Sequence, residues 1–200
     1  MTPGTPERRR LVGACAGVVG PVSFVSGWVV AAATRPGYSP VREAISQLAR
    51  VGAPHRALMT AAFVSFGFTL PVFAPVLADS LDAGKALKAS VSIAGLATLG
   101  VAAVPLSSSG EGTADLLHGM LALLGYCGMA LSPLCGAVAL YRRGDTTAAA
   151  ASVVTGVVSA ASLAASTFAP DVGLFQRLGL GVVDAWLAVM AISLLRGGVS

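Results

Sequence analysis

Three titratable residues occur where the sequence could support proton transfer. Asp115 and His118 are three residues apart at the start of an apolar stretch, so on a helix they share one face. A carboxylate beside an imidazole orients the ring and raises its basicity. Asp184 interrupts the last apolar stretch, where a charged side chain costs roughly 2.5–3.5 kcal/mol on insertion scales. Asp184, His118 and Asp115 are therefore the candidates for a catalytic role, and we expect His118 to be the first partner of Asp184.

Each candidate also has a purely structural interpretation. Asp115 and His118 are placed to cap the beginning of a helix, where an acidic side chain is favourable. Asp184 is placed to form a buried hydrogen bond with a Ser, Thr or Trp of a neighbouring helix. The sequence leaves both interpretations open.

Further polar residues fall near the same predicted side of the membrane and extend this set into an outward-facing polar cavity. The candidates for lining the cavity or contacting a ligand are Arg35, Tyr38, Glu43, Ser46, Glu111, Arg177 and Asp184. Zinc needs three or four converging ligands, and neither the two histidines nor the three cysteines occur at a metal-ligand spacing. We expect no metal and no cofactor.

The composition defines the elements that must position these residues. The 200-residue chain is 55% hydrophobic and 11% charged, with a mean hydropathy of +0.80, whereas soluble domains contain about 25% charged residues. A net charge of +4 without a dense basic patch argues against nucleic acid as a partner. The sequence predicts an all-α, multi-pass protein of the bacterial inner membrane.

Six stretches are long and apolar enough to cross a bilayer, which takes about 20 residues. They predict a six-transmembrane-helix bundle forming a single domain, residues 11–196, after a basic cytoplasmic N-terminus, residues 1–10. The predicted spans are residues 11–34, 56–77, 89–106, 116–140, 147–169 and 173–195.

The basic residues predict that both termini are cytoplasmic and that the protein lies in the cell membrane, because cytoplasmic loops are enriched in Lys and Arg. This orientation places eight basic residues inside: Arg8, Arg9, Arg10, Lys85, Lys88, Arg142, Arg143 and Arg196. It leaves five outside: Arg35, Arg42, Arg50, Arg56 and Arg177.

The first extracytoplasmic loop is predicted to contain an amphipathic helix at residues 40–51. Ser39 and Pro40 are typical of a helix start, apolar residues then recur at helical spacing, and Gly52 is typical of a helix end. The helix either lies on the outer leaflet or covers a cavity, with polar residues turned inward: Glu43, Ser46 and Gln47.

Short motifs in this loop and in the later spans resemble the bacterial membrane family catalogued as domain of unknown function 998. The resemblance covers nearly the whole chain and implies a compact six-span bundle, without implying an activity. It rests on residues 35–40 (Arg-Pro-Gly-Tyr-Ser-Pro) and 45–49 (Ile-Ser-Gln-Leu-Ala), on Pro105 followed by His118, and on residues 173–177 (Gly-Leu-Phe-Gln-Arg).

Three classes of function remain open from the sequence. The first is binding or movement of a lipid or small hydrophobic molecule through the polar cavity. The second is an intramembrane enzyme that acts on a lipid or isoprenoid substrate with carboxylate and histidine groups. The third is a structural or accessory membrane subunit. The expected partners are membrane lipids and a hydrophobic small molecule, and a GxxxG pair, Gly13 and Gly17, indicates tight packing within the bundle or a homo-oligomer interface.

Overall fold

The computed structural model describes residues 4–197, and every regular element within them is a helix. It confirms the predicted all-α class and the six helices, each of which is long and apolar enough to cross a membrane. The α-helices are α1 (Thr5–Ala33), α2 (Arg56–Leu81), α3 (Gly84–Ala103), α4 (Thr113–Arg142), α5 (Thr146–Ala165) and α6 (Val172–Leu195), and one short 3₁₀ helix, η1 (Ile45–Ala49), lies between α1 and α2.

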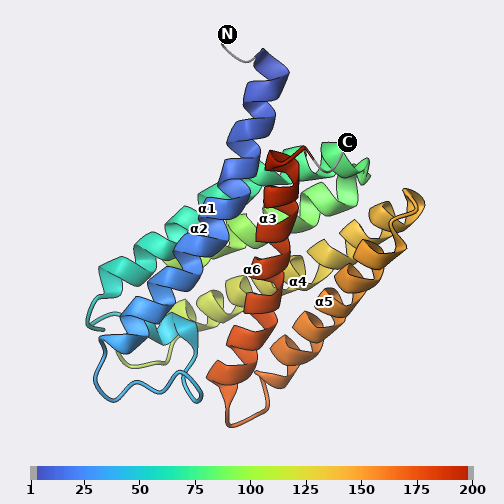
Figure 1. Cartoon of the computed structure of the whole chain (residues 1–200). Helices are drawn as coiled ribbons and strands as arrows, with labels where there is room; N and C mark the ends of the chain where they lie inside the picture. The colour runs from blue at the N-terminus through green and yellow to red at the C-terminus, as the bar shows by residue number, and fades with distance from the viewer. Residues whose placement is uncertain (1–3, 198–200) are drawn as a thin grey trace.

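The six helices form a ring in which each packs against the next one along the chain, and α6 closes the ring by packing against α1 (Figure 1). The described ends of the chain lie at one end of the bundle, here called the terminal end (Figure 1). The long connection between α1 and α2, residues 34–55, lies at the opposite end, here called the loop end (Figure 1). Large apolar side chains, including Phe68, Leu123 and Val154, are exposed on the outside of the ring, as lipid-facing positions require.

Small residues bring neighbouring helices into close contact. A Cβ atom added at Gly128 of α4 would lie 2.7 Å from the backbone nitrogen of Ala94 and 2.8 Å from the carbonyl oxygen of Ser90, both in α3. The pair Gly13 and Gly17 faces side chains of α2 and α6 in the same way. The described contacts of this GxxxG pair are therefore within the bundle.

The helix boundaries differ from the predicted spans at several ends. α1 begins at Thr5, so the three arginines at positions 8–10 lie in its first turns. A proline in the first turn, Pro6, favours this early start. Residues 1–3 of the predicted N-terminal segment lie outside the described residues. α3 begins at Gly84, and α5 ends at Ala165.

The predicted amphipathic helix at residues 40–51 is wrong in extent and type. One turn forms at Ser39–Glu43, Ala44 is extended, and only Ile45–Ala49 is helical, as the 3₁₀ helix η1. The reason is tertiary hydrogen bonding. The Val41 carbonyl accepts from the Leu174 N–H, and the Ile45 N–H donates to the Gln176 side chain at 2.6 Å, so α6 takes backbone groups that a continuous helix would need.

Candidate ligand-binding cavity

The side chain of Arg177, in the first turns of α6, fastens the 34–55 loop to the bundle. Its Nη1 donates to the carbonyls of Pro40 (2.7 Å), Glu43 (3.0 Å) and Gly173 (3.0 Å), and its Nη2 donates to the Tyr38 hydroxyl. Its guanidinium lies 5.0 Å from the ring centre of Trp28, within cation–π range. One cation thus joins three segments of the chain.

Tyr38 is the second part of this anchor. Burial raises the pKa of its hydroxyl, against the opposing effect of the Arg177 charge. The hydroxyl therefore keeps its proton at neutral pH and donates to the carbonyls of Glu43 (3.1 Å) and Ala44 (3.0 Å). Arg35 lies over the same ring and donates to the Gln47 carbonyl at 2.6 Å.

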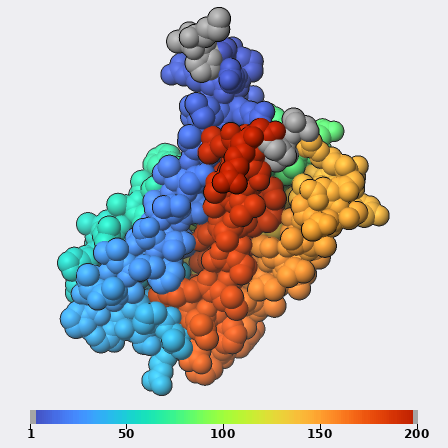
Figure 2. Space-filling view, viewed as in Figure 1, coloured from blue at the N-terminus to red at the C-terminus, as the bar shows by residue number. Residues whose placement is uncertain are grey.

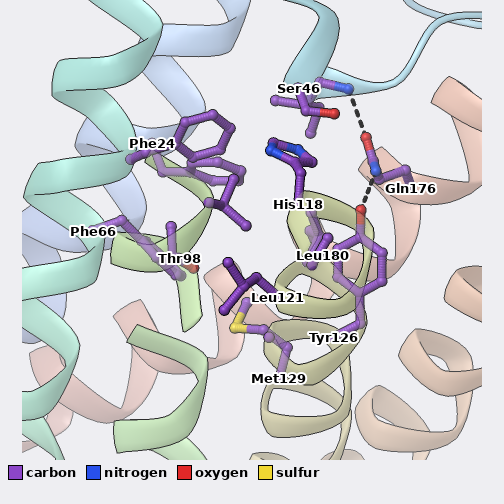
Figure 3. A pocket seen from close by; sticks show the side chains of 15 residues that line it. Phe24, Ser46, Phe66, Thr98, His118, Leu121, Tyr126, Met129, Gln176 and Leu180 are labelled. Carbon is purple, nitrogen blue, oxygen red and sulfur yellow. Dashed lines mark hydrogen bonds between the residues drawn. The ribbon is translucent and has the colours of Figure 1, made fainter. Parts of the chain in front are cut away.

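A small cavity of about 50 Å³ lies under the anchored loop, inside the ring (Figure 3). Its walls are mainly apolar and come from α1, α2, α3, α4, α6 and η1, with Phe24, Phe66, Leu121, Met129 and Leu180 among the side chains that line it. Five polar side chains interrupt this lining: Ser46, Thr98, His118, Tyr126 and Gln176.

His118 carries a buried polar atom of this lining that has no hydrogen-bond partner among the described residues. Its side chain is buried, and Nδ1 lies 2.7 Å from the Val104 carbonyl oxygen. A carbonyl can only accept, so Nδ1 carries the ring proton, and Nε2 of the neutral imidazole is an acceptor. Nε2 is buried without a partner. A buried acceptor left unpaired costs about 1–3 kcal/mol, which a hydrogen-bond donor in the cavity would remove.

Gln176 and Tyr126 form a pair on the opposite side of the cavity from Phe66 (Figure 3). The Gln176 amide nitrogen donates to the Tyr126 hydroxyl, and its oxygen accepts from the Ile45 N–H. The Tyr126 hydroxyl accepts this bond and so retains its own O–H for donation. The cavity therefore offers an acceptor at His118 and a donor at Tyr126.

The structure brings only part of the predicted set into the cavity. His118 and Ser46 line it. Asp115 does not orient His118, because its carboxylate accepts from the Ser107 N–H (3.1 Å) and hydroxyl (2.6 Å). The predicted pairing fails since Val104, and not Asp115, occupies the position beside Nδ1. Asp115 instead fixes the connection between α3 and α4, and Glu111 is exposed in that connection.

The remaining predicted residues lie outside the cavity. Arg35, Tyr38 and Arg177 form the loop anchor, and the Glu43 carboxylate accepts from the Ser39 N–H at 2.8 Å. Asp184 is buried, but its expected partnership with His118 is wrong: neither carboxylate oxygen has a partner among the described residues. Asp184 lines a different depression, between α1 and α6, because it projects from the side of α6 that faces α1.

Sequence reasoning missed Gln176, Tyr126 and Thr98 as cavity residues. A usable signal was present for two of them, because a Gln and a Tyr within apolar spans need hydrogen-bond partners when buried.

The sequence motifs that resemble the family also lie next to one another in the structure. The 35–40 and 173–177 segments join through Tyr38 and Arg177, and the 45–49 segment joins the latter through Ile45 and Gln176.

The fold and the cavity define a multi-pass helical membrane protein with a small, mainly apolar site enclosed at one end of its bundle. Within that class, the chain belongs to the family described as Protein of unknown function (DUF998), whose model matches residues 18–193. The matched region includes all six helices in whole or in large part. Comparisons with curated proteins and with solved structures gave no match.

Proposed function

We propose that this protein binds a small hydrophobic molecule, or the polar end of a lipid, in the cavity under the 34–55 loop. The observation that carries the proposal is the buried, unpaired Nε2 of His118 in a cavity whose walls are otherwise mainly apolar. The ligand that fits this chemistry is an apolar molecule with one hydroxyl group. Its O–H donates to His118, and its oxygen accepts from Tyr126.

The anchored loop forms the cover of the proposed binding site. Residues 34–55 cover the cavity through η1, with Ile45 and Ser46 in the lining. Hydrogen bonds that involve Arg177, Tyr38 and Gln176 hold them on the bundle, together with buried apolar side chains of η1: Ile45, Leu48 and Ala49. No carboxylate lines the described cavity, so the enzyme hypothesis lacks the acid–base pair on which it was based. Binding is the function that the geometry supports best.

The histidines offer a direct test of binding. The chain has two, and His55→Gln leaves His118 as the sole one. We expect hexan-1-ol, added to this variant labelled with ¹⁵N-histidine in maltoside micelles, to move the Nε2 resonance saturably towards the position of a hydrogen-bonded acceptor. Hexyl methyl ether cannot donate a hydrogen bond, and we expect it to leave the resonance unchanged.

A pair of alanine substitutions in α4 provides the control. Ala122 lines the cavity, and Ala114 is exposed on the same helix. Ala122→Leu should fill the cavity and abolish the response to hexan-1-ol, and Ala114→Leu should preserve it. Equal responses to alcohol and ether, or an unchanged response in Ala122→Leu, would contradict the proposal.

We also propose that both termini face the cytoplasm of the cell, with the loop end of the bundle outside. The excess of Lys and Arg at the terminal end supports this orientation. In a chain without its native cysteines, cysteines at exposed positions Ala86 and Thr147 should resist a membrane-impermeant maleimide in intact cells. A cysteine at Ser108, exposed in the α3–α4 connection, should react. The reverse pattern would show the opposite orientation.

A further inference from the structure

Asp184 occupies the least favourable position for a carboxylate in this molecule. It lies near the middle of α6, about 18 Å from Val172 and about 17 Å from Leu195 at 1.5 Å per residue. Its side chain is 3% exposed, and neither oxygen has a hydrogen-bond partner within residues 4–197. A charge at the centre of a bilayer is strongly unfavourable unless it is paired. The cavity proposed above does not use this residue, so its missing partner needs a separate explanation.

The surroundings of Asp184 form a groove on the outside of the ring, between α1 and α6. The two helices lie side by side on one face of the molecule (Figure 2), and the groove between them has a volume of about 420 Å³. Val22 of α1 and Ala185 of α6 border it and are exposed. The groove is therefore open to the lipid side, with the carboxylic acid of Asp184 at its base.

None of the described residues that line the groove is a Lys, Arg or His. Arg177, seven residues earlier on α6, is committed to the loop carbonyls and to Tyr38. His118 belongs to the enclosed cavity and contacts Val104. The described protein thus supplies Asp184 with an apolar groove and no counter-charge.

We propose that this groove is a second binding site, which takes an amphiphile with a protonated amine. The ammonium pairs with Asp184 in a charge-assisted hydrogen bond, which is roughly twice as strong as a neutral one. The alkyl chain lies along the apolar walls that Val22 and Val25 provide on α1. An anionic amphiphile is repelled by the carboxylate, and a neutral alcohol lacks the charge that Asp184 requires.

Trp28 is a built-in reporter of this site. It lines the groove, whereas Trp186, the other of the two tryptophans, contacts Gly136 of α4 and donates to Ser152 of α5. Each Asp184 oxygen exposes less than 1 Å², so an entering ammonium must displace side chains at the base of the groove. That displacement changes the environment of the Trp28 indole and leaves that of Trp186 unchanged.

The test uses the full chain in maltoside micelles, with dodecylamine, dodecan-1-ol and dodecanoate as probes of equal chain length. In Trp186→Phe, we expect dodecylamine to change Trp28 fluorescence saturably, with half-saturation at a concentration about tenfold lower than for dodecan-1-ol. Dodecanoate should give no saturable change. In Trp28→Phe, which retains only Trp186, dodecylamine should have no saturable effect.

Removing the acid tests the role of Asp184 directly. Asp184→Asn, made in Trp186→Phe, should weaken the dodecylamine response to that of the alcohol. The matched control is Asp82→Asn, because Asp82 is an exposed carboxylate at the terminal end, and it should leave the response unchanged. If Asp184→Asn binds the amine normally, the proposal is wrong. If that variant does not fold, the comparison of the three probes decides: equal responses to amine and alcohol contradict the proposal. Neither result depends on hexan-1-ol binding at His118.

Discussion

Gly128→Ala is expected to destabilise the bundle more than any other exchange of glycine for alanine along α4. The new Cβ would lie 2.7 Å from the Ala94 nitrogen and 3.1 Å from its Cα. These are backbone atoms, which cannot move aside by changing a rotamer, so α3 and α4 must separate. Overpacking of this kind costs about 1–3 kcal/mol, and separation also breaks the 3.2 Å hydrogen bond from Ser132 to Ser90.

Gly119→Ala is the matched control, because it makes the same change on the same helix where a Cβ meets nothing within 4 Å. Alanine favours a helix by about 1 kcal/mol over glycine, so this variant should unfold at the wild-type temperature or slightly above it. Thermal unfolding followed by circular dichroism in one detergent would compare the two. Equal melting temperatures would mean that α3 and α4 are not packed as closely as described.

The second large effect is expected at Arg177. Replacement by Met keeps much of the apolar stem but removes the donors to the Pro40 and Glu43 carbonyls and the bond to Tyr38. Hydrogen bonds to charged groups contribute about 1.5–3 kcal/mol each, and some carbonyls will regain water. We therefore expect a loss of about 3 kcal/mol in unfolding free energy, together with faster proteolysis within residues 34–55.

Arg142→Met supplies the comparison for this prediction, because Arg142 is exposed in the last turn of α4. Its loss should change the unfolding free energy by no more than about 0.5 kcal/mol and should not alter cleavage of the loop. Arg177→Lys should fall between the two, since lysine keeps the charge but cannot hold several carbonyls with a planar fork. A loop that resists protease equally in all three variants would contradict the anchoring role of Arg177.

The helices could be predicted from the sequence because a membrane span is a local property. Twenty apolar residues bounded by Gly, Pro or charged residues define it without reference to the rest of the chain. The 34–55 loop shows where this local reasoning fails. Ser39 and Pro40 do begin a turn, but hydrogen bonds from Leu174 and to Gln176 redirect the backbone after it, and no spacing within the loop encodes a partner 131 residues away.

The candidate site could be predicted only in part, because the sequence shows which residues are polar within a span but not which groups they meet. A buried polar residue inside an apolar span can be recognised from sequence, and His118 and Asp184 are both buried. Which groups they meet depends on how the helices are rotated in the ring. His118 faces the interior and meets the Val104 carbonyl, whereas Asp184 faces α1. Because Asp115 and His118 are three residues apart, the sequence predicts that they lie close together. It does not show that the Asp115 carboxylate accepts hydrogen bonds from Ser107 instead.

The closure of the ring by α6 against α1 also has a consequence for biosynthesis. Phe24 lies in α1, which leaves the ribosome before the other five helices, and Gln176 and Leu180 lie in α6, which follows those five. Helices that insert one after another into a bilayer are each stable there before they associate. Insertion of the first five helices therefore leaves the His118 cavity without one wall and the 34–55 loop without its anchor. A nascent chain halted before Val172 would therefore have five helices in the membrane and an incomplete cavity.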